Sequence, residues 1–161
     1  MSILWRAKEQ IEKRLHDANF LANQQWELVI YGSTLSSLSC NEHSDLDMTL
    51  ILHEPHNHTQ VLRDVQDILV QVDHYDQFQS LLLPSGPLLQ FHDYESGVDL
   101  DISVNKILEI INSRLILAYA QLDRRFANLA IVLKMWNKSQ FKDKMTRLNS
   151  YTLNLMLIAF M

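Results

Sequence analysis

The chain has 161 residues, of which 47% are hydrophobic and 20% are charged, with only three glycines and three prolines. This composition is typical of a globular protein with a hydrophobic core and excludes the disordered and fibrous classes. The formal net charge of −5 argues against a strongly basic nucleic-acid-binding chain, so a polyanionic ligand would need a local basic patch or bound metal ions.

Cys40 is the single cysteine, which excludes an internal disulfide framework and a Cys-rich zinc site and favours a reducing compartment. The N-terminal segment lacks the pattern of a signal or transit peptide, and the apolar runs are too short to predict a membrane span. We therefore expect a cytoplasmic protein with no membrane partner, and leave a nuclear or mitochondrial location open.

The first part of the chain alternates helix and strand patterns. Apolar residues recur at helical spacing in its first and last segments, and short apolar runs between them are typical of buried strands. The predicted elements are a helix over 3–24, a strand over 28–31, a short helix over 34–38, a strand over 45–53 and a helix over 59–72.

The second part begins with strands and ends with helices. Turn signals at Pro84-Ser85-Gly86 and Glu95-Ser96-Gly97 separate three strand-like runs. The predicted strands cover 79–83, 87–94 and 97–105, and the predicted helices cover 106–121, 124–139 and 149–161. This order indicates an α+β or mixed α/β fold with helices appended.

Paired aspartates follow a glycine-serine turn. Asp45 and Asp47 lie two residues apart on a predicted strand, so both carboxylates point to one face, and Asp99 and Asp101 repeat this spacing on a later strand. Clustered carboxylates repel unless a cation lies among them, and Mg²⁺ prefers such oxygen ligands. The pattern predicts a phosphoryl-transfer site, with the third carboxylate open between Asp99 and Asp101.

Gly32-Ser33 adds a second element of such a site. A glycine at the turn lets the backbone approach a phosphate closely, and the Ser33 hydroxyl can donate to it. A lone Asp-x-Asp is usually solvated surface and a lone Gly-Ser is usually only a turn, so the prediction depends on their combination with a third acidic strand.

The segments that carry this pattern resemble a known family. YGSTLSSLSCNEHSDLDMTLIL resembles the signature of the DNA polymerase β-type nucleotidyltransferases. GVDLDISVN, LDRRFANLAIVLKMWNK and LNSYTLNLMLIAFM resemble the non-canonical poly(A) polymerases and terminal uridylyltransferases more closely. The resemblance covers essentially the whole chain, with the motifs in the family's order.

The resemblance implies an α+β nucleotidyltransferase palm, a mixed sheet flanked by helices, over 26–105. It implies that 106–161 begins a helical central domain, truncated here, and we expect the helix within 1–25 to pack on that domain. The almost wholly apolar stretch 151–161 would then need a C-terminal helical segment or a partner protein to cover it.

The resemblance also implies roles for particular residues. Asp45 and Asp47 match the aspartates that bridge two Mg²⁺ ions, for which Mn²⁺ can substitute. Asp101 matches the third ligand and is preferred over Asp99 because the family's aspartate directly precedes the isoleucine. The implied nucleotide-binding residues are Gly32, Ser33, Asn112, Lys134, Lys138, Ser150 and Tyr151.

Each of these residues has an implied contact. Ser33 and Ser150 would contact phosphate, Asn112 the ribose, and the ring of Tyr151 the base. Lys134 and Lys138, one helical turn apart, would hold the outgoing phosphates.

Two departures from the family's pattern bear on these roles. Lys106 replaces a second asparagine that many relatives have, which puts a ribose or base contact in doubt. LLLPSGPLLQF lacks an arginine before proline, which leaves RNA contact on that strand open.

The implied activity is template-independent addition of UMP or AMP to an RNA 3′ end, with release of pyrophosphate. UTP and ATP are both open, with a slight preference for UTP. One alternative is transfer to a protein or small-molecule acceptor, and another is an inactive RNA-binding scaffold. His53, His56 and His58 are interpreted as an exposed loop rather than a metal site, and Trp136 as a core residue.

Overall fold

The computed structural model describes residues 3–38, 45–143 and 146–161. Its elements in chain order are α1 (Ile3–Asp17), β1 (Trp26–Ile30), α2 (Gly32–Leu35), β2 (Leu46–Leu52), α3 (His58–Leu69), β3 (Tyr75–Leu83), β4 (Gly86–Asp93), β5 (Val98–Val104), α4 (Ile107–Leu122), α5 (Arg124–Gln140) and α6 (Ser150–Phe160). All the predicted elements are present. In the described part of the chain, no helix is both long and apolar enough to cross a bilayer.

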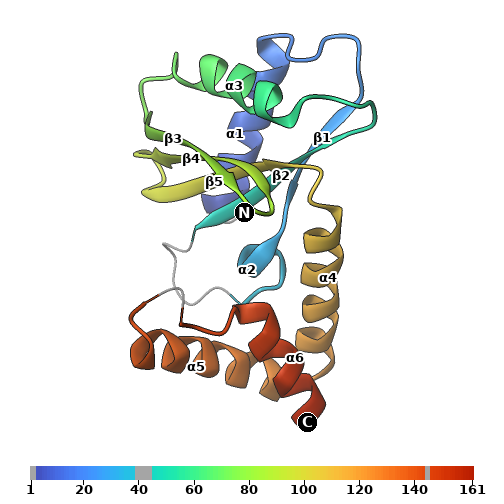
Figure 1. The fold of residues 1–161 in the computed structure, drawn as a ribbon, viewed down its shortest axis with the longest axis vertical. Helices are drawn as coiled ribbons and strands as arrows, with labels where there is room; N and C mark the ends of the chain where they lie inside the picture. Colours follow the sequence, from blue (N-terminus) through green and yellow to red (C-terminus); the bar gives the residue numbers. More distant parts are fainter. Residues whose placement is uncertain (1–2, 39–44, 144–145) are drawn as a thin grey trace.

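The strands form one mixed sheet in the order β1-β2-β5-β4-β3. β2 and β5 are parallel, and every other neighbouring pair is antiparallel. Two helices, α1 and α3, cover one face of this sheet (Figure 1). The expected α+β palm, with a mixed sheet flanked by helices, is confirmed.

Helix α1 belongs to the palm. Its buried face packs into the same core as the sheet and α3, and this face consists of Leu4, Ala7, Ile11 and Leu15. The expectation that this helix packs on the helical domain is therefore wrong, because its apolar stripe is already used by the palm core.

Helix α1 also ends seven residues earlier than its predicted end at 24, at Asp17. Asn19 and Leu21 have φ values of 52° and 48°, which no α-helix can accommodate. This irregular turn buries Phe20, whose carbonyl accepts a hydrogen bond of 3.0 Å from the Trp26 indole. Phe20 does not lie on the apolar face of α1, so the chain leaves the helix after Asp17 in order to bury it.

The last three helices form a separate group, here called the helical unit (α4, α5 and α6), with its own small core. Helix α4 leaves the palm at the end of β5 and leads to α5 and α6 (Figure 1). The buried residues of this second core are Leu38, Ile116, Phe126, Ala130 and Leu157. Because Leu38 comes from the segment after α2, this core also joins the helical unit to the palm.

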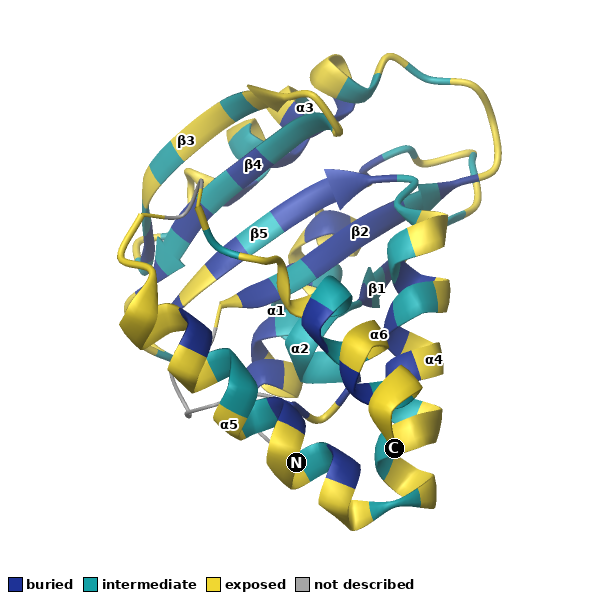
Figure 2. Cartoon of the chain, turned by 60° about the horizontal axis from the view of Figure 1, so that its bottom comes forward, coloured by how far each residue is buried: buried dark blue, intermediate teal, exposed yellow. Residues whose placement is uncertain are grey.

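Much of the apolar surface of the helical unit is exposed (Figure 2). On α6 only Leu153 and Leu157 are buried, whereas Phe160 is 86% exposed. Trp136 on α5 is 50% exposed and contacts Phe141 edge-on, so its expected core position is wrong. Its face of α5 points away from the second core.

Candidate active site

The sheet brings two of the predicted carboxylates side by side. Asp47 on β2 pairs in register with Asp101 on the parallel strand β5. Asp45 lies just before β2, two residues from Asp47, and is exposed, whereas Asp47 is half-buried. Parallel pairing of two strands that each carry an aspartate at the same level is therefore what creates the acidic cluster.

The neighbouring strand β4 separates the roles of Asp101 and Asp99. Gln90 donates from its amide nitrogen to both carboxylate oxygens of Asp101, at 2.9 and 3.0 Å. Asp99 instead contacts His92, with 2.7 Å between Oδ1 and Nδ1. The register thus places Asp101, and not Asp99, directly beside Asp47.

The acidic cluster is electrostatically unfavourable without a cation. Burial, and then repulsion from Asp101 and Asp45, raise the pKa of Asp47 to about 7, although the positive charge of Lys134 lowers it. Oxygen ligands that repel one another suit Mg²⁺, whose charge would let all of them ionise. In residues 3–38, 45–143 and 146–161, no three acidic, cysteine or histidine side chains already form a metal cage. The ligand set of Asp45, Asp47 and Asp101 therefore stays a prediction.

Gly32 also has a structural role that the sequence does not predict. It has a φ of +70°, and a Cβ at this position would lie 2.3 Å from Asp47 Oδ2. Its backbone N–H donates to Ser113 Oγ at 2.8 Å, so it is not available for a phosphate. The glycine is needed to make room for the Asp47 carboxylate.

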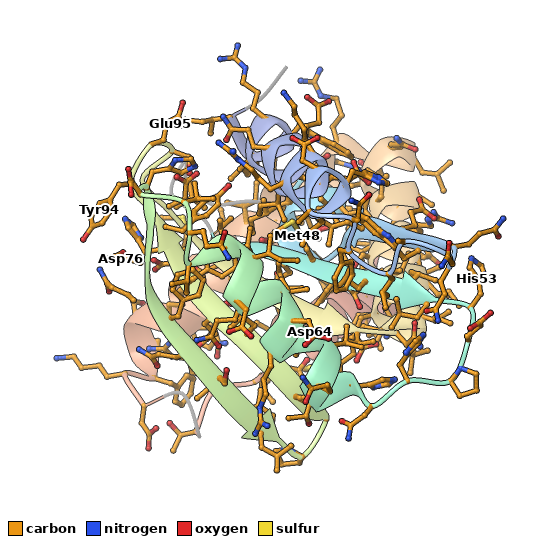
Figure 3. The ribbon with its side chains drawn as sticks, turned by 90° about the horizontal axis from the view of Figure 1, so that it is seen from above. Met48, His53, Asp64, Asp76, Tyr94 and Glu95 are labelled. Atoms are coloured by element: carbon orange, nitrogen blue, oxygen red, sulfur yellow. The ribbon has the colours of Figure 1, made fainter. Side chains whose placement is uncertain are left out.

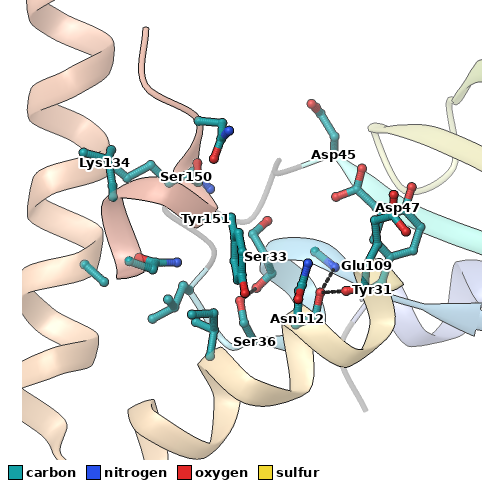
Figure 4. Close-up of a pocket in the computed structure, with 18 of the residues that line it drawn as sticks. Tyr31, Ser33, Ser36, Asp45, Asp47, Glu109, Asn112, Lys134, Ser150 and Tyr151 are labelled. Carbon is teal, nitrogen blue, oxygen red and sulfur yellow. Dashed lines mark hydrogen bonds between the residues drawn. The ribbon is translucent and has the colours of Figure 1, made fainter. Parts of the chain in front are cut away.

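A cleft of about 550 Å³ opens beside these carboxylates, between the palm and the helical unit. Asp45 and Asp47 line it, together with every predicted nucleotide-binding residue: Gly32, Ser33, Asn112, Lys134, Lys138, Ser150 and Tyr151. Asp101, beside Asp47 on the neighbouring strand β5, is not among the lining residues. Figure 4 shows Lys134, Ser150 and Tyr151 on one side of the cleft and Asp45, Asp47 and Tyr31 on the other.

Helices α5 and α6 contribute the basic and aromatic side of the cleft. Lys134 and Lys138 lie one turn apart on α5, and none of the ion pairs among the described residues involves either. Asn149 caps α6 by accepting a hydrogen bond of 2.8 Å from the Thr152 N–H, which fixes Ser150 and Tyr151 at the start of that helix. Both lysines line the cleft, and the charge of Lys134 acts on Asp47.

The family model described as "Poly(A) RNA polymerase, mitochondrial-like, central palm domain" matches residues 4–121, which include the whole sheet and all three aspartates. The chain belongs to this family.

Individual relatives agree with this poly(A) polymerase palm. The chain is 30% identical over 144 residues to poly(A) RNA polymerase GLD2-B of Xenopus laevis, covering 85% of this chain and 28% of that protein. It is 29% identical over 168 residues to human poly(A) RNA polymerase GLD2, covering 97% of this chain and 34% of that protein. The chain thus spans about a third or less of the length of these relatives.

Solved structures share the fold of this family member. The crystal structure of mtPAP in complex with ATPgammaS has a TM-score of 0.83 and 21% identity, with 98% of this chain and 37% of that chain covered. The structure of the Cid1 poly(U) polymerase with Mg and 3′-dATP has a TM-score of 0.79 and 23% identity, with 94% and 46% covered. At these identities the comparison supports the fold alone.

Some residues of this palm site were not predicted. Tyr31 lines the cleft, and burial raises its pKa from 10.0 to about 12. Gln90 and Ser113 make hydrogen bonds to site residues although their motifs gave no such role. A polar residue within an apolar strand, as in PLLQF, was the available signal for Gln90.

His53, His56 and His58 are not among the residues that line the cleft. Figure 3 shows His53 on the opposite side of the view from Tyr94 and Glu95, and His58 begins α3. His53 is exposed, as the interpretation of an exposed loop requires, whereas His56 and His58 are intermediate.

Proposed function

We propose that this chain is the catalytic palm, with the beginning of the helical domain, of a template-independent RNA 3′-terminal nucleotidyltransferase. The observation that carries the proposal is the Asp47–Asp101 pair beside a cleft lined by Lys134, Lys138 and Tyr151. Membership of the poly(A) RNA polymerase palm family supports it.

In the proposed site, Asp45, Asp47 and Asp101 would hold Mg²⁺, as two ions that Mn²⁺ can replace. Bound divalent ions would neutralise phosphate charge and acidify the attacking hydroxyl. The fit rests on these oxygen donors: burial, and then repulsion from Asp101 and Asp45, raises the pKa of Asp47 to about 7, and a bound cation would offset both effects.

The remaining groups would bind and orient the nucleotide. Lys134 and Lys138 would hold the β- and γ-phosphates, and the hydroxyls of Ser33 and Ser150 would donate to phosphate oxygens. Tyr151 would stack on the base, and Asn112 would contact the ribose.

The proposed reaction is attack of the RNA 3′ oxygen on the α-phosphorus. The bond from the α-phosphorus to the pyrophosphate oxygen would break as the new phosphodiester bond forms, and Asp101 would accept the proton of the 3′-hydroxyl. Gln90, which donates to both oxygens of Asp101, would fix the orientation of that carboxylate.

We propose ATP as the first candidate donor and UTP as the second, which reverses the slight preference taken from the sequence. Relatives such as the Xenopus and human GLD2 proteins are named poly(A) RNA polymerases, whereas the Cid1 structure is described as selective for UTP. The described cleft itself contains Tyr151, which can stack on either base.

We also propose that a further helical segment or a partner protein covers the exposed apolar faces of the helical unit. Phe160 is 86% exposed and Leu122 is 82% exposed, which is costly for isolated helices in water. GLD-2, a structural neighbour, was solved in complexes with RNP-8 and with GLD-3.

A cytoplasmic location is proposed from the single cysteine, Cys40, which lies outside the described residues.

The test compares donors and acceptors in one assay. The intact protein is incubated with Mg²⁺ and each of the four labelled nucleoside triphosphates, either with an RNA oligomer or with protein and small-molecule acceptors. The proposal predicts RNA extension with ATP or UTP and no label on other acceptors. Label on a protein or small molecule instead would favour the second superfamily activity, and binding of RNA without any transfer would favour a scaffold.

A further inference from the structure

Ser113 connects helix α4 to the glycine-serine turn of the palm. It is 8% exposed and lies on the face of α4 that points to α2. Its Oγ accepts a hydrogen bond of 2.8 Å from the Gly32 N–H and donates one of 2.7 Å to the Glu109 carbonyl.

These two bonds occupy the Ser113 hydroxyl. A serine has one O–H to donate, and that donor is used by the carbonyl one helical turn earlier. The accepted bond satisfies a backbone N–H in a half-buried turn that would otherwise lack a partner. Ser113 therefore holds the turn in place instead of offering a donor to a ligand.

The turn held by Ser113 is the same turn that fits around Asp47. The Tyr31 N–H donates to the Asp47 carbonyl at 3.0 Å, and the missing Cβ of Gly32 leaves the space for Asp47 Oδ2. Gly32 thus has the acidic cluster on one side and Ser113 on the other, so a shift of the turn would move both Ser33 and Asp47.

A second contact fastens the same segment to the helical unit. Leu38, which follows α2, packs in the second core with Ile116, one turn beyond Ser113 on α4, and with Ala130 on α5. Ala130 lies one turn before Lys134. Two contacts therefore fix the position of the palm side of the cleft relative to the side that carries the lysines. They are the hydrogen bond at Gly32 and the apolar contact at Leu38.

We propose that Ser113 is a positioning residue that fixes the Gly32–Ser33 turn against α4 and thereby sets the width of the nucleotide cleft. The proposal rests on the proposed function in that the cleft binds a nucleoside triphosphate. It does not depend on which molecule accepts the nucleotide.

The experiment compares Ser113→Ala, which removes the acceptor for the Gly32 N–H, with Ser113→Thr, which keeps a hydroxyl at the same place. Binding of ATP and of UTP with Mg²⁺ is measured without RNA, followed by KM and kcat for RNA extension. Hydrogen exchange of the peptide containing Gly32 reports the bond itself. Arg114→Ala, an exposed neighbour on the same helix, is the control.

We expect Ser113→Ala to weaken triphosphate binding and raise KM about tenfold, as loss of one buried hydrogen bond would, with faster exchange at Gly32. Ser113→Thr is expected to restore both, and Arg114→Ala to leave both unchanged. Unchanged binding in Ser113→Ala would overturn the proposal, as would equal weakening by Ala and Thr, which would assign the effect to side-chain volume. If the intact protein binds Mg²⁺-triphosphate but extends no RNA, the proposed function fails while this test still gives its answer.

Discussion

The Asp47 carboxylate lies against the backbone of Gly32 in the space that a side chain would fill, because a Cβ on Gly32 would lie 2.3 Å from Asp47 Oδ2. The turn and the carboxylate are therefore one structural feature, although Gly32 and Asp47 lie on separate elements. This relationship explains why the turn needs glycine and leads to the first prediction.

Gly32→Ala should abolish nucleotide transfer, because the new methyl group displaces the Asp47 carboxylate. Gly97→Ala is the matched control, since Gly97 has a φ of +68° but nothing within 4 Å of the added Cβ. Both variants should lose about 1–2 kcal/mol of unfolding free energy from backbone strain, measured by thermal melting. Loss of activity in both variants, or in neither, would contradict the displacement of Asp47.

The raised pKa of Asp47 makes the stability of the metal-free protein depend on pH. Its folded pKa of about 7 exceeds the ordinary 3.8, so the folded state binds the proton more tightly than the unfolded state. This contribution is fully present below about pH 4 and is lost as pH rises to 7, an effect of about 1–4 kcal/mol.

The measurement is unfolding in a chelator at several pH values, comparing the protein with Asp47→Asn. The stability of the protein relative to the variant should fall as pH rises, and adding Mg²⁺ should reverse the fall. Parallel pH curves for the two proteins would show that Asp47 titrates normally.

Gln90→Leu should lower kcat about tenfold, because Asp101 loses the amide that contacts both its oxygens. KM for the triphosphate should change little, since Gln90 does not line the cleft. The control is Gln79→Leu, at the position paired with Gln90 on β3. A rise in KM with unchanged kcat would assign Gln90 to nucleotide binding instead.

Lys138→Ala should raise KM for the triphosphate about tenfold with a smaller effect on kcat, because a phosphate contact in the ground state is lost. Lys142, four residues on, is exposed and outside the cleft lining, so Lys142→Ala is the matched control. The KM and kcat of both variants are measured by steady-state kinetics at a fixed RNA concentration. Equal KM values for both variants would remove Lys138 from the proposed phosphate site.

The sequence was sufficient for the elements and for the acidic strands. Apolar runs and turn residues predicted β2 and β5, although Asp45, expected on the strand with Asp47, lies just before its first residue. The preference for Asp101 over Asp99 came from family resemblance, and the register gives it a physical basis, because Asp101 is the residue beside Asp47.

Long-range relationships could not be predicted in the same way. The Gly32–Ser113 bond joins residues 81 positions apart, and the Gln90–Asp101 bonds depend on the β4–β5 register, which no local pattern fixes. The predicted length of α1 was wrong because burial of Phe20 depends on tertiary contacts. The core position predicted for Trp136 was wrong because apolar character alone does not say which face of α5 packs into a core.

The central claim is tested most directly by RNA extension with the intact protein, Asp47→Asn, Asp101→Asn and Asp99→Asn, each with Mg²⁺ and ATP or UTP. The account predicts extension by the intact protein and by Asp99→Asn, and loss of at least about a hundredfold in the other two, as removal of a catalytic electrostatic group causes. Extension by Asp47→Asn at the rate of the intact protein, or loss in Asp99→Asn with activity kept in Asp101→Asn, would contradict it.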